Sequence, residues 1–479
     1  MEVFLINTIT IYITPKGYQK QRAESEKGDF VLESDIFKPS RYNLIDEDES
    51  GYYLLANTFS RALIRVNTAT FKKVKEILDE PTIDINSMNK NKILAQSLVE
   101  NRFLIPGDFD ELEFLGNLYE KSRKWEKDLG VAIVLTLNCN FDCVYCYQDH
   151  LALDMPKKVE DSILKYVKRN LPGLEKLAIS WFGGEPTLRM ERIKNLSAIL
   201  MNSCENNGCT YQSAITTNGF LLTGANAEIL KTCCIENVQV TLDGPAAIHD
   251  QRRFLKSGKG TFDTILDNVM TSAHLFEKFT LRINIDRFNA NSIIQLLEIL
   301  EPIKNEVRLA FRPTQSYEFS KNSVHPTFSQ SEYLPIEDRL IDEASQRGFR
   351  ILIGYTGLSS TFCSAYRQNV FTVDPYGDVH RCPNVIGRRK DRYGFLNREG
   401  VLIRNDNSIQ REWDTYTPLD TTECRVCIAL PLCMGGCLWN SQSSKVNSYK
   451  CFPKYGIIKR MRVDCSLNTN LSTGGDNYE

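Results

Sequence analysis

Residues 137–148 read LNCNFDCVYCYQ and place Cys139, Cys143 and Cys146 in a C-x3-C-x2-C spacing. The apolar run that leads into this loop, residues 131–137, is expected to be a buried strand. Three thiolates on one tight loop can bind three irons of a cubane iron–sulfur cluster and leave the fourth iron open to another ligand. A structural zinc site expects four ligands, and His150 is the one further candidate near the loop. The spacing therefore favours an iron–sulfur site.

Five more apolar runs follow this loop, with helical patterns between them. We expect the corresponding strands at residues 177–182, 212–216, 238–242, 281–285 and 307–311. Six strand–helix alternations predict an α/β fold whose parallel sheet is covered by helices on one side and curled into part of a barrel. Sites on such folds lie at the carboxyl ends of the strands. The peptides at four of these ends carry polar residues, glycine or cysteine: NCNFDC, GGEPT, TTNG and LDGP.

The order of these peptides resembles that of the radical S-adenosylmethionine (SAM) enzymes, and the resemblance covers roughly residues 130–315. It implies a partial (β/α)6 barrel with a [4Fe-4S] cluster on Cys139, Cys143 and Cys146. The GGEP-like peptide of that family receives the methionine amino group, and the cluster reduces SAM to give a 5′-deoxyadenosyl radical. The candidate SAM-binding residues are Tyr145, Gly183, Gly184, Glu185, Pro186, Thr217, Asn218, Asp243, Arg253 and Asn284. Arg253, in a run that resembles the stretch after the fourth strand of SPASM-containing relatives, would bind a carboxylate of cofactor or substrate, and an ordinary ion pair is the alternative. Arg282 shares a strand face with Asn284 and is expected to point into the barrel.

Seven cysteines near the C-terminus form a second pattern: Cys363, Cys382, Cys424, Cys427, Cys433, Cys437 and Cys451. Their spacing resembles that of the SPASM domain, the auxiliary-cluster module of radical enzymes that modify peptides and proteins. The resemblance implies an outer [4Fe-4S] cluster on Cys424, Cys427, Cys433 and Cys451 and an inner one on Cys363, Cys382 and Cys437. Residues 371–382 predict a hairpin, with its turn at 375–378, that would bring Cys363 and Cys382 together. A pair of zinc knuckles is the alternative for residues 424–437.

One iron is left without a ligand in this scheme. Three cubanes hold about twelve irons, ten motif cysteines cover ten of them, and SAM covers an eleventh. Fully ligated relatives carry a further cysteine shortly before the first SPASM cysteine, but here that stretch reads GYTGLSSTF, and the nearest upstream cysteine is Cys234. We therefore expect an inner auxiliary cluster with an open site that accepts a substrate cysteine thiolate. Cys465 is the competing ligand.

Residues 38–124 predict a small winged-helix-like module. Strands are expected at 42–45, 52–56 and 62–66, and helices at 70–78, 92–101 and 109–122. The module resembles the leader-recognition element of peptide maturases, which would bind an extended leader by strand addition to a sheet edge; a helical cap is the alternative. The predicted division is 1–124 recognition module, 125–315 partial barrel, 316–360 bridging helical segment, 361–465 SPASM domain and 466–479 disordered tail.

Composition excludes two classes of function. The 479 residues carry 58 basic and 60 acidic side chains, so no broad cationic surface is available for nucleic acid. No apolar run reaches the roughly 18 residues of a membrane span. Residues 1–19 alternate like a strand and lack the features of a signal peptide. We therefore expect a cytoplasmic protein with neither nucleic acid nor membrane as a partner.

Together these features predict a radical SAM oxidoreductase that forms a cysteine thioether, of the sactionine or ranthipeptide kind, in a ribosomally made precursor peptide. The inner cluster would hold the thiolate and take up the surplus electron, and a flavodoxin- or ferredoxin-type protein would supply electrons. Three alternatives stay open: carbon–carbon crosslinking of side chains, sulfatase-type maturation, and a zinc-stabilised binding scaffold.

Overall fold

The computed structural model describes residues 5–6, 9–12, 34–47, 50–88, 91–317, 326–353, 361, 363–405, 408–438, 457–458 and 460–461. Cys451, Cys465 and the predicted tail at 466–479 lie outside these ranges. In the described part of the chain, no helix is both long and apolar enough to cross a membrane.

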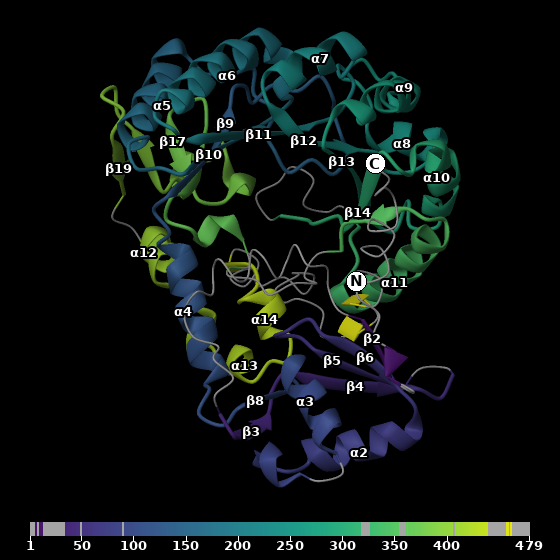
Figure 1. Ribbon diagram of the computed structural model, residues 1–479. Coiled ribbons are helices and arrows are strands. Elements are labelled where there is room, and N and C mark those ends of the chain that lie inside the picture. Colours follow the sequence, from purple (N-terminus) through teal and green to yellow (C-terminus); the bar gives the residue numbers. More distant parts are fainter. Residues whose placement is uncertain are drawn as a thin grey trace, which may run out of the picture.

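A curved parallel sheet occupies the centre of the upper lobe, with helices on its outer side (Figure 1). Each strand pairs with the next one in the chain, and the strands are β9 (Asp128–Val134), β10 (Lys176–Phe182), β11 (Thr210–Thr217), β12 (Ile235–Thr241), β13 (Lys278–Ile285), β14 (Val307–Pro313) and the short β15 (Arg350–Ile351). The helices between and after them are α5 (Lys157–Asn170), α6 (Met190–Glu205), α7 (Gly224–Thr232), α8 (Ala246–Arg252), α9 (Phe262–Ser272), α10 (Ile293–Leu300) and α11 (Gln330–Gln346). One continuous apolar core joins the strands to these helices.

The six predicted strands are all present, but the first begins and ends earlier than expected. Residues 131–137 were predicted from their apolar run, whereas β9 covers Asp128–Val134. The backbone after Val134 leaves the sheet because it bonds the loop that precedes α5: Leu137 N donates to Leu153 O, and Met155 N donates to Leu135 O. This departure delivers the cysteine loop to the carboxyl end of the sheet.

Strands from the cysteine-rich C-terminal region continue the same sheet past its first strand. β16 (Val370–Val373) pairs in parallel with β9, and β17 (Asp378–His380), β18 (Gly394–Leu396) and β19 (Leu402–Arg404) follow in antiparallel order. The predicted hairpin is therefore confirmed. Its turn lies one residue earlier than expected, because Gly377 N donates to Asp374 O at 2.9 Å and Gly377 adopts φ +82°, a conformation that glycine reaches without strain.

The N-terminal module is built around an antiparallel sheet of order β1-β2-β6-β5-β4. Its strands are β1 (Leu5–Ile6), β2 (Ile9–Tyr12), β4 (Asn43–Glu47), β5 (Tyr53–Asn57) and β6 (Leu63–Val66), and a second small sheet contains β3 (Ile36–Pro39), β7 (Ile83–Asp84) and β8 (Leu104–Pro106). The three predicted strands and three predicted helices are present, the helices as α2 (Thr68–Leu78), α3 (Lys92–Glu100) and α4 (Glu111–Arg123). The single strand expected in residues 1–19 is instead the pair β1 and β2, which extends this sheet through β6.

The module packs against the segment that contains Cys424, Cys427 and Cys433 (Figure 1). The short helices of that region are α12 (Ser408–Thr415), α13 (Thr422–Arg425) and α14 (Leu430–Cys433). Leu115 and Tyr119 of α4 share a buried cluster with Leu430 and Met434. In addition, Thr58 Oγ1 donates to Ile428 O at 2.6 Å. The module and the C-terminal cysteine segment therefore share one apolar interior.

Candidate functional site

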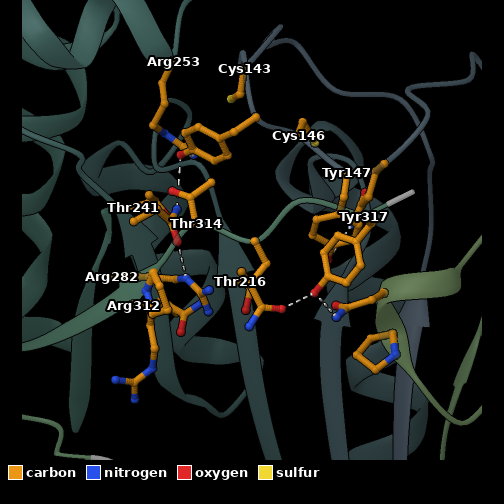
Figure 2. Close-up of a pocket in the computed structure, with 18 of the residues that line it drawn as sticks. Cys143, Cys146, Tyr147, Thr216, Thr241, Arg253, Arg282, Arg312, Thr314 and Tyr317 are labelled. Carbon is orange, nitrogen blue, oxygen red and sulfur yellow. Dashed lines mark hydrogen bonds between the residues drawn. The ribbon is translucent and has the colours of Figure 1, made fainter. Parts of the chain in front are cut away.

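A cavity of about 630 Å³ lies at the carboxyl ends of the parallel strands, and Figure 2 shows part of its lining. Its volume is typical of a small-molecule site, which spans roughly 300–1,000 Å³. Cys139, Cys143 and Cys146 form one part of the wall, and Cys437 from the C-terminal region forms another. Two cysteine motifs that are far apart in the chain thus border the same space.

The first cysteine loop is held by its backbone and by a buried ring. Asp142 N donates to Phe254 O and Val144 N donates to Arg252 O, while the Phe141 ring meets Phe220 edge to face. Burial raises the pKa of Cys139 and of Cys143 to about 12. A buried thiolate therefore needs a compensating positive charge, and iron supplies it when a cluster binds.

The glycine pair after β10 packs directly on this loop. A Cβ atom at Gly184 would lie 2.1 Å from Asn138 O, and one at Gly183 would lie 2.6 Å from Thr136 O. Glu185 N also donates to Asn138 O, at 2.9 Å. No larger residue fits at either position without moving the cysteine loop, and both glycines line the cavity. This wall therefore presents three thiols and the backbone of two glycines, which have no side chain. Such a surface fits an iron–sulfur cluster with a small polar ligand beside it.

Glu185 does not line the cavity but forms hydrogen bonds to residues that do. Its side chain is fully buried and accepts hydrogen bonds from Thr187 N (3.0 Å), Thr187 Oγ1 (2.6 Å), Thr217 Oγ1 (2.6 Å) and Asn218 N (2.6 Å). Burial nevertheless raises the pKa of this carboxyl group. Pro186, at the first position of the 3-10 turn that follows, has no N–H to leave unsatisfied. Thr217 and Asn218 line the cavity, so Glu185 fixes two of the predicted cofactor residues.

Tyr145 is the centre of a second buried network. Its hydroxyl lies in hydrogen-bond contact with Asp243 and receives bonds from Arg253 (2.8 Å) and Asn284 (3.2 Å). Burial raises the Tyr145 pKa well above its usual value, so the hydroxyl keeps its proton and donates to Asp243. The Asp243 carboxylate also accepts from Asn284 N at 2.9 Å. Four predicted residues from four separate segments are thus joined around one hydroxyl group.

His249 supports this network without lining the cavity. Asp243 N donates to His249 Nδ1 (3.2 Å), and His249 Nε2 lies 3.2 Å from Thr261 Oγ1. The ring is fully buried, and burial lowers its pKa to about 4. It is therefore neutral at physiological pH, with its proton on Nε2, because Nδ1 acts as an acceptor.

Cys363 and Cys437, which are predicted to bind the inner cluster, lie near enough to Cys382 to affect its pKa. Burial raises the pKa of Cys382 to about 12, and the neighbouring Cys363 and Cys437 contribute further in the same direction. Cys363 and Cys382 pack against the cluster that contains Tyr366 and Trp413.

The three outer cysteines that the structure describes, Cys424, Cys427 and Cys433, do not line the cavity. Cys424 and Cys427 pack against the cluster that contains Tyr42 and Phe59, and Cys433 is buried in an adjoining cluster with module residues. Among the residues that the structure describes, no group of three or more His, Cys, Asp or Glu side chains is arranged to hold a single metal ion.

Sequence reasoning missed much of the cavity wall, including Tyr147, Arg312 and Tyr317. The rings of Tyr147 and Tyr317 meet at 5.4 Å, and Tyr317 lies next to the inner cysteines, where Asn384 Nδ2 donates to its hydroxyl at 2.8 Å. Arg312 falls one residue beyond the strand predicted at 307–311. Extending that strand by two residues would have placed Arg312 on the face already assigned to Arg282 and Asn284.

Comparison with known proteins identifies the central region. Residues 133–300 match the Radical SAM superfamily model. Mycofactocin maturase MftC of Mycolicibacterium smegmatis is 25% identical over 343 residues, which is 66% of this chain and 80% of that protein. The serine-type anaerobic sulfatase-maturating enzyme of Klebsiella aerogenes is 22% identical over 315 residues, covering 62% and 76% of the two chains.

The fold also agrees with a solved structure. Histidine-tagged anSMEcpe with bound AdoMet superposes with a TM-score of 0.55 at 20% identity, over 72% of this chain and 98% of that one. This likeness concerns the fold. Residues 133–300 are thus similar to the radical SAM superfamily, whose members use SAM with a [4Fe-4S] cluster.

Proposed function

We propose that this chain, through its radical SAM domain, modifies a precursor peptide by joining a cysteine sulfur to a carbon atom of another residue. The observation that carries the proposal is the cavity itself, because the first cysteine loop and Cys437 of the inner cysteine group border one space. A substrate bound there would touch the radical source on one side and the inner cysteines on the other. When bound, SAM and its cluster supply a radical that removes a hydrogen atom from the substrate.

We assign a role in cofactor binding to each of the predicted site residues. Cys139, Cys143 and Cys146 would bind the cluster. The backbone at Gly183 and Gly184, with Thr217 and Asn218, would receive the methionine part of SAM. Tyr145, Asp243, Arg253 and Asn284 would close the opposite side and shield the reacting atoms from water, with Glu185 and Pro186 holding the wall in place.

The inner group would bind a second cluster on Cys363, Cys382 and Cys437, and the outer group a third on Cys424, Cys427, Cys433 and Cys451. The sequence has no cysteine between Cys234 and Cys363, so the inner cluster would keep a position for a substrate thiolate. An iron of the inner cluster that binds a substrate thiolate would distinguish the proposed thioether chemistry from carbon–carbon crosslinking, which needs no substrate thiol.

Iron analysis of the purified chain tests the cofactor assignment. Anaerobically reconstituted protein should contain about twelve irons and cleave SAM when reduced. Replacing Cys143 by alanine should remove about four irons and abolish cleavage, whereas Cys234→Ser, at an exposed cysteine outside the motifs, should change neither. Full SAM cleavage by the Cys143 variant would reject the assignment.

Mass spectrometry of a co-expressed peptide tests the reaction. A short cysteine-containing reading frame beside the gene supplies the candidate precursor. A thioether removes two hydrogens per link and leaves that cysteine resistant to alkylation. The same mass loss with every thiol still alkylatable would favour carbon–carbon crosslinking instead.

We further propose that the free edge of β4 binds the leader of that peptide. In the described part of the chain β4 pairs with β5 alone, and Ile45 on it is exposed. A photo-crosslinking residue at position 45 should capture a labelled leader peptide, while the same residue at the exposed Ile93 of α3 should not. Equal capture at both positions would reject the proposal.

Sulfatase-type maturation is the second candidate, because the Klebsiella relative bears that description. The two functions differ in what the N-terminal module does. A maturase that needs a leader loses its substrate when the leader is removed. An enzyme of the sulfatase type would modify a short peptide around the target residue equally well with or without an added leader.

A further inference from the structure

Within the described part of the chain, two arginines in the cavity have no carboxylate partner. The described lining residues include four arginines, Arg253, Arg282, Arg312 and Arg460, and a single carboxylate, Glu337. Glu337 is paired with Arg460 at 2.9 Å, and Arg253 donates to Tyr145. Across the described ranges, neither Arg282 nor Arg312 forms an ion pair.

The two arginines lie near the ends of adjacent strands. Arg282 is on β13 and Arg312 on β14, and the register pairs Asn284 with Arg312. Figure 2 shows both arginines on the same side of the cavity. Arg282 Nε donates to Asn284 Oδ1 (2.7 Å), and Arg312 Nη1 donates to Phe311 O (2.7 Å). These bonds orient the two side chains and use one donor of the five on each guanidinium.

The like charges of two partly buried arginines in one cavity wall cost free energy. Burial, and then the like charge of Arg312, lower the pKa of Arg282. Tyr145, Tyr147 and Tyr317 lie near Arg282, but none of them is a carboxylate that could form an ion pair with it. A bound anion would supply the missing negative charge, and planar guanidinium groups match a carboxylate in two parallel hydrogen bonds.

We propose that Arg282 and Arg312 bind a carboxylate of the peptide substrate and thereby select an acidic residue, or the free C-terminus, as the group that enters the cavity. The inference rests on the proposed peptide-modifying function and deepens it. Arg282 lies near Tyr145 of the first cysteine loop and near Tyr317, which in turn lies near Cys382 and Cys437. A carboxylate held there would lie in the cavity that both cysteine groups border.

Three capped tripeptides test the inference on the full chain, reconstituted and saturated with SAM. Acetyl-Gly-Asp-Gly-amide carries a side-chain carboxylate, acetyl-Gly-Gly-Gly carries a terminal one, and acetyl-Gly-Asn-Gly-amide carries none. Saturation-transfer NMR at low ionic strength gives their affinities. We expect at least one acidic peptide to bind about tenfold more tightly than the amide peptide, and the better of the two identifies the source of the carboxylate. Equal binding of all three would overturn the inference.

Two double variants separate the arginine pair from the cofactor. R282Q/R312Q should lose the preference for acidic peptides, and R282K/R312K, which keeps both charges, should retain part of it. Iron content and thermal midpoint check that each variant is folded. If R282Q/R312Q loses affinity for SAM while its preference for acidic peptides persists, the anion belongs to the cofactor and the inference is wrong. A wild-type chain that fails to cleave SAM would instead reject the proposed function itself.

Discussion

Replacing Glu185 with glutamine is expected to destabilise the site wall, although the two side chains have nearly the same shape. One carboxylate oxygen accepts from Thr187 N and the other from Asn218 N. Glutamine offers one acceptor oxygen and one NH2 group. In either orientation of the amide, its NH2 group faces a backbone N–H that then loses its acceptor. A protonated glutamate avoids this conflict because its hydroxyl oxygen can still accept.

The magnitude follows from the bonds that are lost. A hydrogen bond to a charged group contributes about 1.5–3 kcal/mol, and a buried donor without an acceptor costs about 1–3 kcal/mol. Because these two effects overlap, we expect Glu185→Gln to lower the free energy of unfolding by about 2–4 kcal/mol. For a unit of the size of the barrel this lowers the thermal midpoint by about 5–15 °C. Affinity for SAM should fall as well, because Thr217 and Asn218 lose their support.

Thermal unfolding followed by circular dichroism measures the first effect, and equilibrium dialysis with labelled SAM measures the second. Glu191→Gln is the matched control, because Glu191 is an exposed glutamate in the first turn of α6. If Glu185→Gln and Glu191→Gln unfold within about 1 °C of each other and bind SAM equally, the hydrogen bonds to Glu185 do not hold this wall and the reasoning fails.

Three further perturbations probe other parts of the structure. Burial lowers the pKa of His249 from 6.5 to about 4, so the unfolded chain takes up a proton before the folded chain does as the pH falls. In urea titrations the wild type should therefore lose about 2 kcal/mol of stability between pH 7 and pH 5, and His249→Asn should not show this loss. Gly184→Ala should displace the cysteine loop, since its Cβ would lie 2.1 Å from Asn138 O, and should abolish SAM binding in dialysis. Phe59→Ala opens the cluster against which Cys427 packs, so iodoacetamide should alkylate that thiol faster in metal-free protein, as mapped by mass spectrometry.

Each of these changes has a control of the same chemistry at an exposed or open position. His274→Asn replaces an exposed histidine and should leave the pH dependence as in the wild type. Gly224→Ala adds a Cβ with no atom within 4 Å and should leave SAM binding intact. Phe288→Ala removes an exposed ring and should leave the alkylation rate unchanged. An effect in a control equal to that in its partner would show that the contacts named here are not responsible.

The apolar strand periodicity and the turn residues were enough to predict the parallel sheet, because both are local properties of the chain. The end of β9 was misjudged because residues 135–137 are as apolar as a strand but bond to the loop before α5, a contact that periodicity does not contain. The packing of the N-terminal module on the segment that contains Cys424, Cys427 and Cys433 was missed for the same reason. Its residues are apolar in sequence, but which surface covers them depends on chain segments that are distant in sequence.

Some features of the candidate site could likewise be predicted from the sequence, and others needed the tertiary structure. The cysteine spacing and the GGEP-like peptide were enough to predict which thiols group together and that Gly183 and Gly184 are part of the site, because residues close in sequence can be only a limited distance apart. Glu185 is expected at the ligand from the sequence, and the structure adds that its carboxylate accepts four hydrogen bonds from within the protein. The arginine pair emerged only once β13 and β14 were in register, because charge balance depends on every group that faces the cavity.

The sequence by itself was enough to predict iron–sulfur and SAM chemistry, because the thiol spacing and the strand-end peptides are local features of the chain. The tertiary structure decided which of these groups share a cavity, which stand behind it, and which charges among the described lining residues stay unpaired. Those properties come from the packing of distant segments, and the free energy of a buried charge depends on all of its neighbours rather than on those adjacent in sequence.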